Sequence, residues 1–156
     1  SCLPHLLKSE NPHILNISPP LDMNPDWFSG HVAYSMAKFG MSLCVLGMAA
    51  EFKDDGVAVN ALWPRTAIAT AAVKNVLGGE QLVNISRGPE IMADAAYVIL
   101  TKPSKEFSGN FCIDDTLLAE NGVSDFSVYA DVPFDQLAPD FFVPEDMPPP
   151  EAAKKS

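Results

Sequence analysis

Positive charge is scarce in this chain. Its 156 residues include 10 Lys and Arg against 20 Asp and Glu, which gives a formal net charge of −10 at pH 7. A surface that binds nucleic acid or anionic lipid carries a patch of basic side chains. The composition therefore argues against both kinds of partner.

Cysteine and uninterrupted apolar sequence are scarce as well. Cys2, Cys44 and Cys112 form an odd, widely spaced set, which favours reduced thiols. Cys2 and His5 have the spacing of half a zinc site, but no second pair follows at ligand spacing, so we expect no metal. No run approaches the roughly 18 uninterrupted apolar residues that span a bilayer, so we expect no membrane span.

The start of the chain lacks an initiator methionine and the basic and apolar regions of a secretory signal. We therefore expect that the sequence begins inside a longer protein. A glycine-rich phosphate loop after a strand is also absent, because Gly78 and Gly79 end a predicted helix and lack the fingerprint spacing. This segment alone is expected to bind a dinucleotide poorly.

What the sequence does contain is an alternation of strand and helix patterns. Short apolar runs with β-branched residues predict strands at 13–17, 57–62 and 109–113. Helical patterns lie at about 31–54, 67–77 and 89–100. This order favours right-handed parallel crossovers, so we predict an α/β fold with a partial, Rossmann-type doubly wound parallel sheet in residues 1–124. The helix at 31–54 is apolar on most sides, as expected of a buried helix.

The last part of the chain has a different composition. From Ile113 onward there are ten acidic residues and two lysines, and residues 131–156 hold six prolines. The strand and helix pattern decays from about residue 125. We therefore predict that residues 125–156 form an extended, acidic, proline-rich linker or tail.

Tyr34 and Lys38 are the candidate catalytic pair. They lie four residues apart near the start of the long predicted helix, so they share one helix face. A nearby ammonium favours the phenolate and lowers a tyrosine pKa that starts near 10. Such a tyrosine exchanges a proton with an alcohol or carbonyl oxygen. The alternative is a surface tyrosine beside a lysine that reaches for solvent.

Three motifs follow one another at suitable distances. Asn16-Ile17-Ser18 ends the first strand, Tyr34-x-x-x-Lys38 lies on the next helix, and Asn60 to Pro64 ends the second strand. Over roughly residues 1–120, this pattern resembles the second half of a short-chain dehydrogenase/reductase. The resemblance implies an oxidoreductase that uses NADP, or NAD as the alternative, on a hydrophobic or lipid-like alcohol or carbonyl.

The same resemblance implies roles for single residues. Tyr34 is then the general acid or base, and Lys38 tunes it and binds the nicotinamide ribose. Thr66, in the loop after Pro64, is a weaker candidate for contact with the cofactor. The resemblance also implies a peroxisomal or mitochondrial location and a homo-oligomer formed through the helix at 31–54.

The catalytic serine of the family has no counterpart. Pro19 and Leu21 occupy the two positions where it is expected, and neither has a hydroxyl. Ser18 and His31 are possible substitutes, although the alternation of side chains along a strand directs Ser18 the other way. Loss of one preorganised donor typically costs roughly 100- to 1,000-fold in rate.

This departure supports a second interpretation, a binding or scaffold module whose active site has lapsed. The helix at 31–54 would then serve mainly as a subunit interface. Met36, Phe39 and Met48 are candidates for that surface, and packing in a core explains them equally well.

Overall fold

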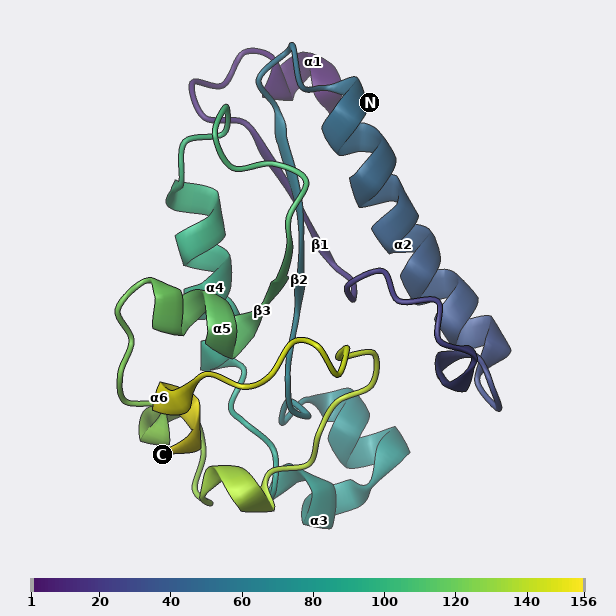
Figure 1. The fold of residues 1–156 in the computed structure, drawn as a ribbon, viewed down its shortest axis with the longest axis vertical. Helices are drawn as coiled ribbons and strands as arrows, with labels where there is room; N and C mark the ends of the chain where they lie inside the picture. The colour runs from purple at the N-terminus through teal and green to yellow at the C-terminus, as the bar shows by residue number, and fades with distance from the viewer. Residues whose placement is uncertain (1, 156) are drawn as a thin grey trace. The chain divides into compact units, whose positions relative to one another are not determined.

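The structure is a computed structural model that describes residues 2–155 (Figure 1). These residues divide into two compact units, one formed by the chain up to Trp63 with Ala96–Cys112, the other by Pro64–Ala95 with the chain from Ile113 onward. The helices and strands, in chain order, are α1 (Leu3–Leu6), β1 (His13–Ile17), η1 (Pro25–Trp27), α2 (Val32–Glu51), β2 (Ala58–Trp63), η2 (Val73–Leu77), α3 (Gly79–Val83), α4 (Glu90–Thr101), β3 (Phe111–Ile113), α5 (Asp114–Glu120), η3 (Ser127–Tyr129), η4 (Phe134–Gln136) and α6 (Glu151–Lys154).

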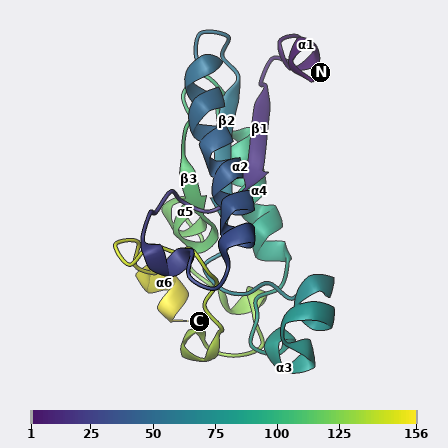
Figure 2. The same ribbon diagram turned by 90° about the vertical axis from the view of Figure 1, so that its right-hand side faces the viewer.

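The sheet of the first unit has the strand order β1-β2-β3. β1 and β2 run parallel, with His13 opposite Ala58 and Ile17 opposite Leu62. α2 connects them and lies on one face of the sheet, whereas the part of α4 from Ala96 onward lies on the other face (Figures 1 and 2). The predicted α/β fold with a partial parallel sheet is confirmed.

β2 is the central strand, and every one of its residues is buried. Val59 and Ala61 point their side chains at Val45 of α2 and form the core of this unit. Polar bonds hold the other edge of the strand: Asn60 Nδ2 donates to Phe107 O at 2.9 Å, and Asn60 Oδ1 accepts from Asn110 N at 3.0 Å. Asn60, which belongs to the motif at the end of the second strand, therefore holds the segment that leads into β3.

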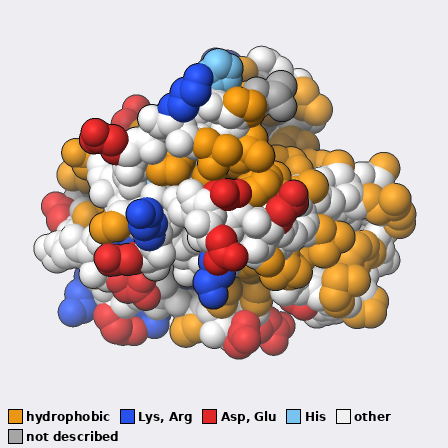
Figure 3. Space-filling model, turned by 90° about the horizontal axis from the view of Figure 1, so that it is seen from above, with side chains coloured by type: hydrophobic (Ala, Val, Ile, Leu, Met, Phe, Trp, Pro, Cys, Tyr) orange, Lys and Arg blue, Asp and Glu red, His pale blue; other side chains and the backbone are white. Residues whose placement is uncertain are grey.

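α2 differs from the buried helix that its composition predicts. Only four of its side chains are buried, those of Ser35, Phe39, Ser42 and Val45. Apolar side chains elsewhere on the helix are exposed, among them Leu43 at 58% and Leu46 at 52%. Hydrophobic side chains gather over the right-hand part of the face seen in Figure 3. By length and composition alone α2 is able to cross a membrane, but its buried stripe packs against β1 and β2.

The second unit departs from the sequence predictions at two places. Residues 65–69 are not helical, because their backbone groups bridge to other segments, and the predicted helix at 67–77 is confined to residues 71–77. The segment from residue 125 onward is not an isolated extended tail. It packs within this unit and buries apolar side chains that lie between its acidic residues and prolines, namely Phe126, Tyr129, Leu137, Phe142 and Ala153.

Candidate active site

Tyr34 and Lys38 lie on consecutive turns at the amino-terminal end of α2. Tyr34 is the third residue of the helix and its side chain is 50% exposed. Lys38 follows one turn later, on the same side of the helix, and is half-buried. The helix thus presents a phenol to solvent and directs the lysine behind it toward the sheet.

The position of the Lys38 ammonium is defined by two contacts. Nζ donates a hydrogen bond to the carbonyl of Ile17 at 3.2 Å, and it lies 5.0 Å from the ring centroid of Trp63. A cation within about 6 Å of a tryptophan ring is attracted to its face. Because Ile17 ends β1 and Trp63 ends β2, the ammonium lies at the carboxyl ends of two adjacent parallel strands. Ligands of α/β folds bind at this edge.

Further side chains fix the loop that leads from β1 to α2. Ser42 Oγ donates to Pro19 O at 2.7 Å in a fully buried position. Ser35 Oγ donates to Trp27 O, and the Phe39 ring stacks on Phe28 with 5.2 Å between centroids. Phe39 therefore packs beneath the loop, which agrees with the core packing that the sequence allowed. It is not part of an exposed interface.

The substitutes for the family serine lie in different surroundings. Ser18 is fully buried, and its Oγ has no hydrogen-bond partner among residues 2–155. Pro19 is buried as well, and Leu21 is half-buried. His31 is exposed at the N-cap of α2, where its side chain makes no capping bond. Of the two candidates, only His31 is exposed to solvent.

Thr66 lies in the second unit and is only 3% exposed. Its Oγ1 has no hydrogen-bond partner within the described part of the chain. A buried hydroxyl without a partner loses the hydrogen bonds it makes to water in the unfolded chain, so a group that bonds it is favoured there.

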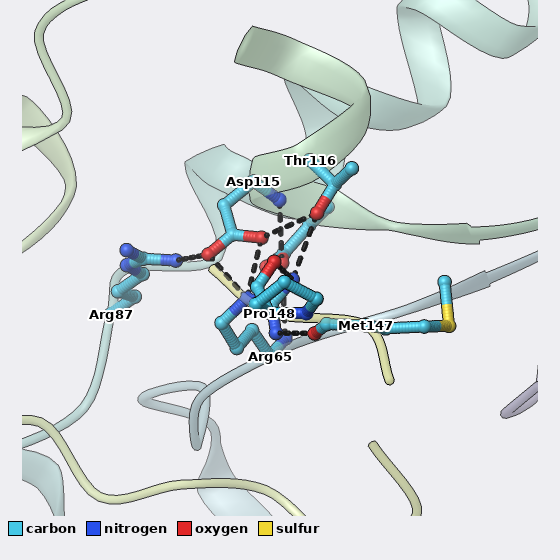
Figure 4. Close-up of polar contacts among 7 residues, drawn as sticks. Arg65, Arg87, Asp115, Thr116, Met147 and Pro148 are labelled. Carbon is cyan, nitrogen blue, oxygen red and sulfur yellow. Dashed lines mark hydrogen bonds and ion pairs between the residues drawn. The ribbon is translucent and has the colours of Figure 1, made fainter. Parts of the chain in front are cut away.

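A buried cluster of charges in the second unit was not predicted from the sequence. Arg65 Nε donates to Asp115 Oδ2 at 2.7 Å, and Arg87 Nη1 donates to the same oxygen at 3.2 Å (Figure 4). The side chains of Arg87 and Asp115 are fully buried, and the Arg87 guanidinium lies 5.7 Å from the ring centroid of Phe126 and 5.6 Å from that of Phe134. One feature of the sequence could have drawn attention to this cluster, namely that Arg65 and Arg87 are the only two arginines in the sequence.

Asp114 shares this cluster. Its Oδ1 accepts from Arg65 N at 3.0 Å and from Asp115 N at 2.7 Å. Burial, reinforced by the neighbouring Asp115 carboxylate, raises the pKa of Asp114 from 3.8 to about 7, although the Arg65 amide and the Arg87 charge oppose this rise. Asp114 is therefore protonated in the folded chain over a pH range in which an exposed aspartate is charged.

The residues at the sheet edge suit one end of a nicotinamide cofactor. An ammonium donates to the hydroxyls of a ribose, and Tyr34 beside it has the phenol needed for proton transfer. No glycine-rich fingerprint lies in the sequence to cradle a pyrophosphate. Lys38 is therefore suited to bind the nicotinamide ribose, whereas the sequence contains no motif that would bind the diphosphate of the same cofactor.

Metal ligands do not cluster in the described part of the chain. Within residues 2–155, no group of three His, Cys, Asp or Glu side chains is arranged to hold an ion. Cys2, Cys44 and Cys112 form no disulfide within the described residues.

The chain has the fold of the carboxyl-terminal part of a short-chain dehydrogenase. The crystal structure of a short-chain dehydrogenase from Mycobacterium thermoresistibile superposes with a TM-score of 0.83 at 50% identity, and the match covers 96% of this chain and 52% of that one. A 7α-hydroxysteroid dehydrogenase superposes with a TM-score of 0.53 at 24% identity, covering 70% of this chain and 45% of the other, which supports the fold alone.

Among curated proteins, the chain is similar to hydroxysteroid dehydrogenase-like protein 2. The protein from Danio rerio is 57% identical over 149 residues, which are 94% of this chain and 35% of the relative. The Homo sapiens protein is 55% identical over 155 residues, 99% of this chain and 36% of the relative. The chain thus spans about a third of the length of these relatives. The resemblance seen in the sequence is confirmed, and no family profile matches the chain.

Proposed function

We propose that this chain is the part of a nicotinamide-dependent oxidoreductase that carries the proton-transfer residue. The observation that supports it most is the placement of the Lys38 ammonium at the ends of β1 and β2, held by Ile17 O and the Trp63 ring, with exposed Tyr34 one turn earlier. The close relatives described as dehydrogenases support the same kind of reaction.

In this proposal Tyr34 gives its phenolic proton to a carbonyl oxygen, or takes one from an alcohol. Lys38 favours the ionised phenol by its charge and binds the nicotinamide ribose through its ammonium. When bound, the nicotinamide supplies or accepts the hydride. Thr66 is proposed as a weaker candidate for a further cofactor contact, on family resemblance alone.

We propose NADP as the cofactor, with NAD as the alternative, and a hydrophobic or lipid-like alcohol or carbonyl as the substrate. Support for a nicotinamide comes from the dehydrogenase relatives that match this chain at 50% identity or more, since hydride transfer in such enzymes is carried by that cofactor. A peroxisomal or mitochondrial location stays a prediction from family resemblance.

The test is a fluorescence titration of NADPH and NADH. We would titrate this chain and a chimaera in which residues 1–156 replace the matching part of the Danio rerio relative. We expect binding by the chimaera and little or none by the chain alone, because no glycine-rich phosphate-binding motif occurs in this sequence. Lys38→Met should weaken binding by the chimaera about tenfold, whereas Lys53→Met, an exposed lysine just after α2, should not. Equal effects of the two substitutions would rule out the role given to Lys38.

The alternative function is a scaffold in which α2 joins two copies of the chain. It is favoured by the exposed apolar side chains Leu43 and Leu46 and by Met36, which is 66% exposed. Turnover of the chimaera separates the two functions, because both allow a dimer through α2. A scaffold predicts no turnover of any carbonyl tested, together with a dimer in sedimentation that Leu43→Glu disrupts and Leu7→Glu, at an exposed leucine outside α2, does not.

A further inference from the structure

The first turn of α2 carries Tyr34 but lacks the usual stabilisation of a helix start. The N-cap residue is His31, and its side chain makes no capping hydrogen bond. No acidic residue lies in the first turn to balance the positive end of the helix dipole. Because the ends of a helix fray when they are poorly capped, contacts from outside the helix are needed to hold this turn in place.

The loop that leads from β1 to α2 supplies such contacts. Trp27 O accepts a hydrogen bond from Ser35 Oγ, and Ser35 is the fully buried residue that directly follows the phenol-bearing residue in the helix. Phe28 O accepts from His31 N at 3.2 Å, and the Phe28 ring stacks on that of Phe39 in α2. The end of the loop is thus joined to the turn that carries the phenol.

Asp22 in turn holds this loop. Its Oδ2 accepts from the indole Nε1 of Trp27 at 2.6 Å, and its Oδ1 accepts from Asn24 N at 3.0 Å. Asn24 Oδ1 accepts from Asp26 N at 3.1 Å and caps the short helix η1, which contains Trp27. The two oxygens of one carboxylate therefore close the loop on itself, and hydrogen bonds to a charged acceptor are stronger than those between neutral groups.

We propose that Asp22 is a positioning residue for proton transfer by Tyr34. Its carboxylate fixes Trp27, the Trp27 carbonyl fixes Ser35, and Ser35 directly follows Tyr34. All of these residues belong to the same compact unit as Lys38. The inference rests on the proposed function, in which Tyr34 transfers the proton. The physical basis is orientation, because a small displacement of a reacting group lowers the rate of a chemical step steeply.

Three variants of the chimaera test the bond between Asp22 and Trp27. Asp22→Ala removes both acceptor oxygens, and Trp27→Phe removes the indole N–H but keeps an aromatic ring. Asp22→Asn is the conservative variant, since its amide keeps one acceptor oxygen for the indole. Asp26→Ala is the matched control. Asp26 is an exposed aspartate of the same loop, and within residues 2–155 it joins this network through its backbone N–H, which alanine retains.

The assay is the reduction of decanal, an apolar aldehyde, by NADPH. Hydride passes from NADPH to the carbonyl carbon and the Tyr34 proton passes to the oxygen, so the products are decanol and NADP⁺. We expect Asp22→Ala and Trp27→Phe each to lower kcat at saturating NADPH about tenfold. The Kd for NADPH should stay within twofold of the parent value, because the ends of β1 and β2 hold the Lys38 ammonium.

Two further comparisons separate positioning from a general loss of structure. The double variant Asp22→Ala with Trp27→Phe should lower kcat little beyond either single variant, since both substitutions break the same bond. Asp22→Asn should recover most of the parent kcat, and Asp26→Ala should retain all of it. Amide hydrogen exchange at residues 35–38 should become faster in Asp22→Ala and in Trp27→Phe.

The outcomes distinguish the inference from the function on which it rests. If the parent chimaera binds no nicotinamide or reduces no decanal, proton transfer by Tyr34 fails and the role of Asp22 fails with it. If the parent reduces decanal and Asp22→Ala does so equally fast, the positioning role alone is overturned. Equal losses of kcat and of NADPH binding, or additive losses in the double variant, also overturn it.

Discussion

Tyr34 with Lys38 and Arg65 with Asp115 are two charged or polar centres built on opposite plans. Tyr34 is half exposed, and Lys38 reaches the ends of two adjacent strands. Arg65 and Asp115 are 7% and 0% exposed in their side chains, and they join segments far apart in the sequence. An exposed group is free to meet a substrate, whereas a buried charge needs its partners to stay folded. We therefore expect chemistry from the first centre and rigidity from the second.

The largest expected effect is that of a substitution at Tyr34, in the first centre. Tyr34→Phe in the chimaera should lower turnover by roughly 100- to 10,000-fold, because it removes the proton that Tyr34 transfers. Cofactor binding and the thermal unfolding midpoint should stay close to those of the parent. Tyr97→Phe, at a tyrosine that is 70% exposed on α4, is the control and should leave turnover unchanged. Equal loss of turnover, binding and stability in Tyr34→Phe would indicate a folding role.

The next largest effect is expected for a substitution at Asp115, in the second centre. Asp115→Asn should destabilise the chain by about 3–5 kcal/mol, because it leaves the buried guanidinium groups of Arg65 and Arg87 without a counter-charge. Urea unfolding of the 156-residue chain measures this loss.

The matched control is Glu80→Gln, which breaks an ion pair with Lys74 whose side chains are 65% and 54% exposed. Its cost should be below about 1 kcal/mol, since exposed ion pairs are screened by solvent. Similar losses in both variants would contradict the contrast drawn between buried and exposed pairs.

The pH dependence of stability sharpens the comparison. Because the pKa of Asp114 is about 7 in the folded chain and 3.8 in an ordinary environment, the folded state holds a proton between these values that the unfolded state has released. The free energy of unfolding should therefore fall as the pH rises from about 4 to about 7, by at most about 1.4 kcal/mol per pH unit. Unfolding of Asp114→Asn should show a flatter profile over this window. The exposed Asp131→Asn should retain the slope, and a slope that survives in Asp114→Asn would assign it to another group.

The smallest effect concerns the loop that leads into the first centre. Ser42→Ala removes the buried bond to Pro19 O and should cost about 1 kcal/mol in urea unfolding. Ser29→Ala, at an exposed serine before α2, should change the stability by less than half as much. If Ser42→Ala also lowers the turnover of the chimaera, the loop contributes to the geometry around Tyr34.

Most of the sheet and its helices could be predicted from local patterns. The strand predicted at 13–17 is β1 residue for residue, and the helix predicted at 31–54 is α2 with slightly shorter ends. These elements follow from hydrophobic periodicity and from turn-forming residues near their ends, which act over a few residues. The helix predicted at 67–77 begins only at residue 71, because backbone bonds to Arg87 and Ala138 hold residues 67–69 extended.

The pair Tyr34 and Lys38 could be found because its spacing lies within one helix. Its partners could not, since Ile17 and Trp63 reach the ammonium only when β1 and β2 pair in register. The exposure of apolar side chains on α2 could not be predicted from the sequence either. The composition of an apolar helix is the same whether or not other segments cover it.

By itself, the sequence determined the order of strands and helices, the face that Tyr34 and Lys38 share, and the resemblance to short-chain dehydrogenases. The tertiary structure alone decided that the acidic, proline-rich segment folds back, and that both arginines meet at Asp115 with Arg65 bound to Met147 O. Local patterns are encoded by neighbours in the chain. A buried ion pair joins residues separated by dozens of positions, and only the packed chain brings them within hydrogen-bond distance.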